Sequence, residues 1–128
     1  MGPTLALIHS PFVGASCWRA VAVELGARGK RAIAVDYGAV GPGDDQASVC
    51  GRIAECLTNE GDVVICVHSA AGALARTIAD DGRASVVGTI FVDAILPTPS
   101  RSWLETAPAA LARRLLDRAA RGRLPPWS

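Results

Sequence analysis

The hydrophobic positions of this sequence follow two alternating patterns. Four short runs are apolar and mostly β-branched, which is typical of strands buried within a sheet. These runs are residues 4–8, 32–35, 63–67 and 86–92. Between them, apolar residues recur every three or four positions, as they do on one face of a helix. Strands that alternate with helices over short connections predict an α/β domain: a parallel sheet of about four strands with helices on both faces, in three α/β/α layers.

The sequence changes character after Pro97. Residues 97–100 are proline and hydroxyl residues, which predicts a linker, and a helical stripe of leucines follows. Residues 1–97 carry 7 Lys/Arg against 10 Asp/Glu, whereas residues 98–128 carry 6 against 2. We therefore divide the chain into an α/β part, 1–97, and a helical segment, 98–128.

Polar residues follow each of the predicted strands. In a parallel sheet the carboxyl ends of the strands meet at one edge, and binding and catalytic groups collect there. The polar residues at these ends are His9, Ser10, Asp36, Ser69 and Asp93. The sequence thus predicts one functional edge of the sheet.

Ser69 stands where the third apolar run passes directly into a helical pattern. A strand that stops at a serine and continues as a helix lifts the hydroxyl above the sheet edge. There the first free N–H groups of the helix can stabilise a developing oxyanion. This is the geometry of a nucleophile elbow. The alternative is a serine that only caps the buried helix.

The composition excludes several classes of function. Half of the residues are apolar, a fifth are charged and the net charge is +1, which indicates neither a disordered chain nor a nucleic-acid partner. The four cysteines have no paired metal-ligand spacing, so we expect no metal and no cofactor. No stretch resembles a signal peptide or is long enough to span a membrane. We expect a reduced, cytoplasmic protein with no membrane partner.

Three motifs follow one another along the chain. They are Leu7–Pro11 followed by Trp18, then Val35–Tyr37, and then Val67–Gly72. Together they resemble the α/β-hydrolase family over nearly the whole chain, and in particular its small plant-type esterase and hydroxynitrile lyase members. The first motif is similar to the family's His-Gly oxyanion loop and the last to its G-x-S-x-G elbow. The resemblance implies the strand order second, first, third, fourth, in the N-terminal half of a hydrolase core, with the start of a helical cap behind it.

The resemblance also implies the residues of an oxyanion site. Ser69 is the nucleophile, and the N–H of Ala70 is one oxyanion donor. Pro11 stands where the family usually has the second donor, and proline has no N–H. That donor would then be the Phe12 N–H or the Ser10 hydroxyl.

A catalytic triad is incomplete in this sequence. The family places serine, acid and histidine in that order along the chain. Asp93 is a candidate acid, but the two histidines, His9 and His68, both precede Ser69. The family uses the first of these positions to shape the oxyanion loop, and the side chain of His68 should point away from its neighbour Ser69. Val67 replaces the glycine of the family's elbow, which predicts a turn that is slightly opened or strained.

The function implied by the resemblance is hydrolysis of an ester-like or other acyl bond in a small-molecule substrate, by a serine hydrolase that is incomplete in these 128 residues. A non-hydrolytic enzyme on the same fold, a lyase or cyclase, is one alternative. A truncated, inactive chain that acts as an interaction partner is the other. The fourth strand would form an open apolar edge of the sheet, which predicts a homo-oligomer through that edge.

Overall fold

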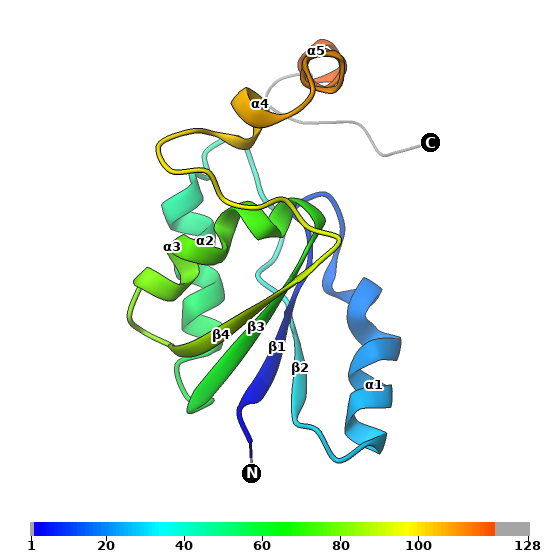
Figure 1. The fold of residues 1–128 in the computed structure, drawn as a ribbon, viewed down its shortest axis with the longest axis vertical. Coiled ribbons are helices and arrows are strands. Elements are labelled where there is room, and N and C mark those ends of the chain that lie inside the picture. The colour runs from blue at the N-terminus through cyan, green and yellow to red at the C-terminus, as the bar shows by residue number, and fades with distance from the viewer. Residues whose placement is uncertain (1, 120–128) are drawn as a thin grey trace.

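Four parallel strands form a single sheet in the order β2-β1-β3-β4 (Figure 1). The computed structural model describes residues 2–119. The strands are β1 Thr4–Ile8, β2 Ala32–Val35, β3 Asp62–His68 and β4 Ser85–Val92. Each predicted apolar run lies within one of these strands, and the expected fold class and strand order are confirmed.

Helices cover both faces of the sheet. Helix α1, Arg19–Ala27, lies on one face, and α2, Gln46–Cys56, and α3, Ala75–Asp80, lie on the other (Figure 1). Two 3₁₀ turns, η1 Ala15–Trp18 and η2 Ser69–Leu74, lead into α1 and α3. The connection from β1 to β2, which contains α1, therefore crosses one face of the sheet. The connections from β2 to β3 and from β3 to β4, which contain α2 and α3, cross the other face.

Helix α2 shows how the sequence sets these elements. Its N-cap is Asp45, whose carboxylate accepts a hydrogen bond from the Ser48 N–H at 2.8 Å and satisfies one free donor of the first turn. Val49, Ile53 and Leu57 recur at helical spacing and are buried. This face binds α2 to the sheet.

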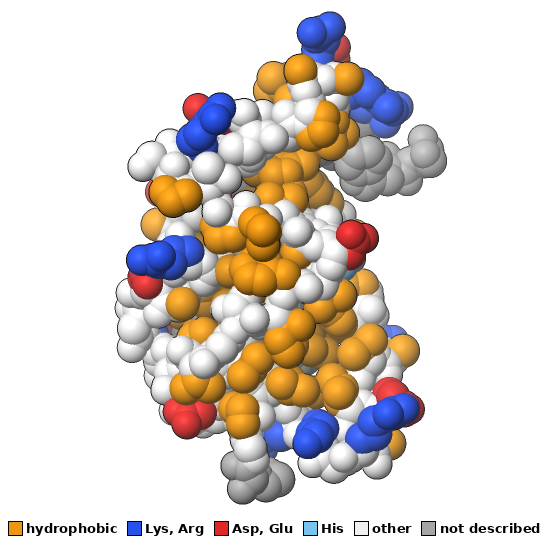
Figure 2. Space-filling view, in the orientation of Figure 1, with side chains coloured by type: hydrophobic (Ala, Val, Ile, Leu, Met, Phe, Trp, Pro, Cys, Tyr) orange, Lys and Arg blue, Asp and Glu red, His pale blue; other side chains and the backbone are white. Residues whose placement is uncertain are grey.

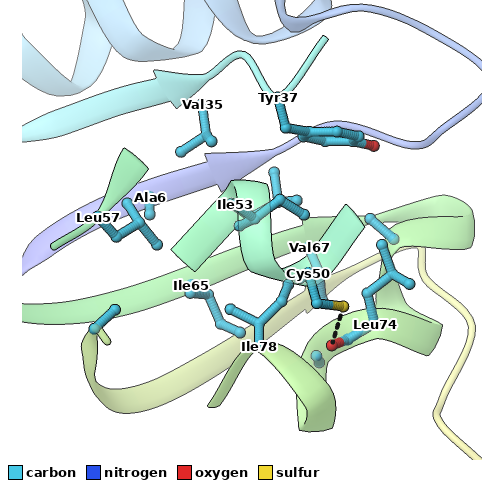
Figure 3. Packing of buried hydrophobic residues seen from close by; sticks show 14 of the residues in the cluster. Ala6, Val35, Tyr37, Cys50, Ile53, Leu57, Ile65, Val67, Leu74 and Ile78 are labelled. Carbon is cyan, nitrogen blue, oxygen red and sulfur yellow. Dashed lines mark hydrogen bonds between the residues drawn. The ribbon is translucent and has the colours of Figure 1, made fainter. Parts of the chain in front are cut away.

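The main core lies between the sheet and the helices α2 and α3 (Figure 3). Ile65 and Val67 of β3 are fully buried there, together with Ile53 of α2 and Ile78 of α3. The buried side chains beneath α1 on the other face are Leu7, Trp18 and Cys66. Because burying one such aliphatic side chain contributes about 1.5–3 kcal/mol, the α2–α3 face supplies most of the hydrophobic stabilisation.

The buried thiol of Cys50 in α2 predicts that the protein loses stability at alkaline pH. Its side chain is buried beside the Leu74 carbonyl, and burial raises the pKa of the thiol from 9.0 to about 11. Below pH 9 the folded and unfolded chains both hold this proton, whereas between pH 9 and 11 only the unfolded chain releases it. We expect the free energy of unfolding to fall by about 2 kcal/mol across this window.

Urea denaturation at a series of pH values measures this loss. The Cys50→Ala variant should show a shallower decline, because its thiol no longer titrates. Burial also raises the pKa of Tyr37, so part of the decline above pH 10 should persist in the variant. Equal slopes for both proteins would contradict the assignment to Cys50.

Two further helices lie beyond the carboxyl ends of the strands (Figure 1). They are α4, Trp103–Thr106, and α5, Ala109–Arg118. Helix α4 begins with a capping box, in which Ser102 Oγ accepts the Glu105 N–H and the Glu105 carboxylate accepts the Ser102 N–H. The expected helical segment contains both helices, and its residues 120–128 lie outside the described part. Across residues 2–119, no helix has the length and apolarity needed to cross a bilayer.

Strand β4 is an edge of the sheet. Within the described residues it pairs with β3 alone, and Val87 is an extra residue that forms a bulge in this pairing. The side chains of Val87, Ile90 and Phe91 are 56%, 47% and 39% exposed. Figure 2 shows the hydrophobic surface that gathers over this strand. The open apolar edge expected from the sequence is therefore present.

Candidate active site

The carboxyl ends of β1 and β3 meet at the point where the winding of the sheet reverses. Ile8 of β1 is in register with Val67 of β3, so the loops that begin at His9 and Ser69 leave the sheet side by side. In open parallel sheets, ligands bind in the crevice at such a switch point. This edge is therefore the candidate active site.

Ser69 forms the turn between β3 and η2. Its backbone is left-handed, with φ of +53°, although it is not glycine. Such a conformation costs a non-glycine residue about 1–2 kcal/mol, so the surrounding structure must hold it in place. A tight left-handed turn lies where the elbow was predicted, but the expected helix does not resume at once: the chain makes the 3₁₀ turn η2 first and becomes α-helical at Ala75.

The loop after β4 packs against the turn of Ser69. The Ile95 N–H donates a hydrogen bond of 3.0 Å to the Ser69 carbonyl oxygen. The Ile95 carbonyl lies directly against Gly72, where a Cβ atom would overlap both the oxygen and the carbon. Gly72 is thus required for the close approach of the two loops. The sequence contained this glycine within the elbow motif, but no pattern showed which segment would cross it.

The residues two before and two after Ser69 fit the turn. Val67 is fully buried and keeps its strand partners Ile8 and Phe91, so β3 is not opened by the missing glycine. Ala71 is also fully buried. The strain expected from Val67 is instead seen in the backbone of Ser69 itself.

The loop after β1 folds around Ser10. The Phe12 N–H donates to Ser10 Oγ at 3.3 Å, and the Val13 N–H donates to the Ser10 carbonyl at 3.1 Å. The two expected alternatives for the second oxyanion donor are therefore joined to each other. Ser10 Oγ thus accepts from Phe12, and Ser10 itself is buried.

The side chain and the carbonyl of His9 are held by contacts within the fold. It is buried and stacks on the Tyr37 ring, with centroids 4.1 Å apart and the planes within 6° of parallel. The Tyr37 hydroxyl donates to the His9 carbonyl at 2.8 Å. His9 Nδ1 lies 2.8 Å from the Ser10 carbonyl oxygen and therefore carries a proton that it donates there. These contacts fix the loop, as the resemblance implied.

His68 lies on the other side of β3 from the core. Its ring meets Trp18 edge-on, with centroids 5.9 Å apart and an angle of 81°. Trp18 belongs to the cluster beneath α1, so the His68 side chain points toward that face, away from the turn of Ser69, as expected. His9 Nδ1 donates within its own loop and His68 packs against Trp18, and no hydrogen bond joins either ring to Ser69 among the described residues. His9 Nε2 is buried and has no hydrogen-bond partner there.

The two acidic residues at the strand ends differ in their contacts. Asp93 is exposed and left-handed, with φ of +43°, and it directly follows Val92, the strand partner of His68. It therefore leaves the sheet beside Ser69. The Asp36 carboxylate instead accepts the Gly38 N–H at 3.0 Å and anchors its own loop.

An aromatic contact joins the helical segment to the site. Trp103, the first residue of α4, lies 6.1 Å from Phe12 between ring centroids, with the rings tilted by 57°. Phe12 belongs to the loop that carries Ser10, so α4 covers part of this loop. The sequence showed Trp103 only as the start of a helix, because no local pattern connects residues about 90 positions apart.

Among the described residues, no group of three His, Cys, Asp or Glu side chains lies close enough to hold a metal ion. The four cysteines are free thiols, and Cys50 and Cys66 are buried. Burial raises the pKa of the Cys66 thiol, which keeps it protonated and unreactive. The polar side chains that the ends of β1, β3 and β4 bring to this edge are His9, Ser10, Ser69 and Asp93.

Comparisons with known proteins detect relatives at the level of structure. No protein-family model and no curated protein sequence matches the chain. Among solved structures, an extracellular α/β-hydrolase from a Paenibacillus species is similar over 91% of this chain and 51% of its own, with 20% identity and a TM-score of 0.73. The pyrethroid hydrolase of Sphingobium faniae is 30% identical over 78% of this chain and 43% of its own, with a TM-score of 0.66.

A third similar structure is methylketone synthase I of tomato, in a histidine-to-alanine variant complexed with β-ketoheptanoate. It is 17% identical over 93% of this chain and 50% of its own, with a TM-score of 0.69. The chain thus spans about half the length of each of these structures. The likenesses agree on the fold, whereas the chemistry named for each structure differs.

Proposed function

We propose that this chain, which has a partial α/β-hydrolase fold, carries the nucleophile and oxyanion part of a serine hydrolase that acts on an ester-like or other acyl bond of a small molecule. The observation that carries the proposal is the left-handed backbone of Ser69, with φ of +53°, on the turn at the switch point of the sheet. A serine that only caps a helix has extended backbone and needs no such strain. An exposed nucleophile on a tight elbow does need it.

In the proposed reaction, Ser69 Oγ attacks the carbonyl carbon of the substrate and forms a tetrahedral intermediate. The Ala70 N–H and the Ser10 hydroxyl donate to the oxyanion, which lowers its free energy. Collapse of the intermediate expels the alcohol and leaves an acyl group on Ser69, and water then hydrolyses this ester. Asp93, at the end of the neighbouring strand, is the candidate acid.

The base is the part that these residues do not provide. His9 Nδ1 is hydrogen-bonded within its loop, His68 packs against Trp18, and neither ring is hydrogen-bonded to Ser69 among the described residues. The proposal therefore assigns the base to a group outside these 128 residues. A serine without a base is a weak nucleophile, so the isolated chain should acylate slowly and respond to a base added in solution.

Labelling with a fluorophosphonate tests the proposal. We expect mass spectrometry to find the adduct on Ser69, and imidazole to accelerate its formation by at least about tenfold. The Ser69→Ala variant should lose the adduct. Ser100→Ala is the matched control, because Ser100 is also left-handed, with φ of +60°, but lies in an exposed loop. An adduct elsewhere, or none with imidazole present, would overturn the nucleophile assignment.

Non-hydrolytic chemistry on the same fold, by a lyase or cyclase, is the second candidate. Pro11 supports it, because it removes the N–H that the resemblance expects in the oxyanion loop, and Ser10 beside it is buried. The likeness to methylketone synthase I, whose structure holds β-ketoheptanoate, supports it as well. Two results together would favour this candidate: fluorophosphonate does not label Ser69, and the Ser10→Ala variant binds β-keto acids more weakly than the wild type does. An unlabelled Ser69 without such binding would favour the inactive interaction partner.

A further inference from the structure

Tyr37 places a buried hydroxyl beside the loop that carries Ser10. The residue follows β2 by two positions, as Ser10 follows β1, and the two strands end in register at Val35 and Ile8. Its side chain is 3% exposed and belongs to the main core. Figure 3 shows it at the end of that core, with its hydroxyl oxygen pointing away from Val35. A phenylalanine would bury the same ring, and a buried hydroxyl costs free energy unless it is hydrogen-bonded.

The partner of this hydroxyl is the first carbonyl of the loop after β1. Tyr37 Oη donates to the His9 carbonyl oxygen at 2.8 Å, and the two rings stack with their centroids 4.1 Å apart. Burial raises the pKa of the Tyr37 hydroxyl, so the group keeps its proton and remains a donor at neutral pH. Tyr37 thus holds His9 through both its side chain and its carbonyl.

A donor that fixes this carbonyl also fixes the next peptide group. The peptide between His9 and Ser10 is planar and trans, so the Ser10 N–H points opposite to the carbonyl that Tyr37 holds. The Ser10 carbonyl is held in turn by the proton on His9 Nδ1 at 2.8 Å and by the Val13 N–H at 3.1 Å. The Phe12 N–H then closes the loop on Ser10 Oγ at 3.3 Å. One series of hydrogen bonds therefore connects the core to both candidate oxyanion donors of this loop.

The two ends of this hydrogen-bond series differ in exposure. Tyr37 is buried, and the turn around it is closed by the Asp36 carboxylate, which accepts the Gly38 N–H at 3.0 Å. The other end is the tip of the loop, where Phe12 and Val13 are 39% and 46% exposed. Oxyanion donors are most effective when they are fixed before the charge develops, because they then need no reorganisation. The buried end at Tyr37 is the part that can supply this rigidity.

We propose that Tyr37 is a positioning residue for the acylation of Ser69, which it promotes by holding the oxyanion loop through the His9 carbonyl. The inference rests on the proposed function, because it requires that Ser69 is acylated. Every contact in the hydrogen-bond series lies within residues 9–38. A tyrosine with a purely structural role would affect stability alone, whereas a positioning residue affects the step in which negative charge develops.

The Tyr37→Phe variant tests the proposal, because it keeps the ring and removes only the hydroxyl. With imidazole present, we expect fluorophosphonate to label Ser69 at least about tenfold more slowly than in the wild type. In this reaction Ser69 Oγ bonds to phosphorus, fluoride leaves, imidazole takes the proton, and negative charge develops on the phosphoryl oxygen. Thr4→Val is the matched control: it removes another buried hydroxyl, which donates to the Glu60 carbonyl at the opposite end of β1, and it should be labelled at the wild-type rate. Circular dichroism checks that both variants fold.

Alkylation separates positioning of the oxyanion loop from a general disturbance of the site. In a Ser69→Cys variant whose exposed Cys17 and Cys56 are changed to serine, iodoacetamide alkylates the introduced thiolate. Sulfur bonds to a saturated carbon and iodide leaves, so no oxyanion forms and the oxyanion donors are not needed. Tyr37→Phe added to this variant should therefore leave the alkylation rate unchanged.

The possible outcomes distinguish this inference from the proposed function. If Tyr37→Phe slows labelling and alkylation equally, then Tyr37 only maintains the turn of Ser69, and the inference is wrong. If the wild type is labelled and Tyr37→Phe is labelled equally fast, the inference is wrong while the proposed function stands. A wild type without an adduct on Ser69 would overturn the proposed function, and this inference with it.

Discussion

The Gly72→Ala variant is expected to lose about 3 kcal/mol or more of its free energy of unfolding. The added methyl group would occupy the space of the Ile95 carbonyl, so either the loop after β4 or the turn η2 must move. Overpacking of side chains costs about 1–3 kcal/mol, and here the obstacle is backbone, which cannot rotate away. The shift would also break the hydrogen bond from Ile95 to Ser69. Urea denaturation measures the loss, and slower fluorophosphonate labelling of Ser69 should accompany it.

Gly88→Ala is the matched control for Gly72→Ala. Both glycines are half-buried or buried and have negative φ, but a Cβ atom on Gly88 meets its neighbours at ordinary contact distance. We expect its free energy of unfolding to change by less than about 1 kcal/mol. Equal losses in the two variants would show that Ile95 does not lie on Gly72 as described.

Ile65→Ala should cost about 2–5 kcal/mol of unfolding free energy. Ile65 is fully buried in the central strand β3, in the cluster that contains Ile53 of α2 and Ile78 of α3 (Figure 3). Truncation removes buried apolar surface and leaves a cavity that the strand cannot close, because β1 and β4 hold it on both sides. Thermal or urea denaturation measures the effect.

Ile90→Ala provides the comparison within the same sheet. Ile90 is 47% exposed on the edge strand, so its truncation leaves no closed cavity, and we expect a loss below about 1 kcal/mol in dilute monomer. A loss as large as that of Ile65→Ala would show that Ile90 is covered in solution.

The fold was predictable because its main determinants are local. Each strand is an unbroken apolar run, and Asp45 with Val49, Ile53 and Leu57 defines α2 by capping and spacing alone. The strand order followed from the resemblance, which the sheet confirms. The elbow was predictable for the same reason, because a strand that ends at a serine is visible within a few residues.

The features that the sequence did not predict depend on contacts between distant segments of the chain. Gly72 is a required glycine only because Ile95 crosses it, and Trp103 reaches the site only because α4 folds back over Phe12. The hydrogen bond from Phe12 to Ser10 joins the two predicted oxyanion donors, and it depends on a loop conformation that no spacing encodes. The expected helix after Ser69 begins as the 3₁₀ turn η2 and becomes α-helical at Ala75.

The hydrogen bond from Ile95 to Ser69 connects the loop after the edge strand β4 to the turn of Ser69. Ile95 follows β4 by three residues, so a strand that docks on β4 and a group that acylates Ser69 both act on the same loop. If a group that docks on β4 and a ligand that binds at Ser69 both favour the same loop position, then each strengthens the binding of the other by the same factor, because binding free energies around a closed cycle are reciprocal. An edge strand placed in this way can act as an effector site for the serine without touching the substrate.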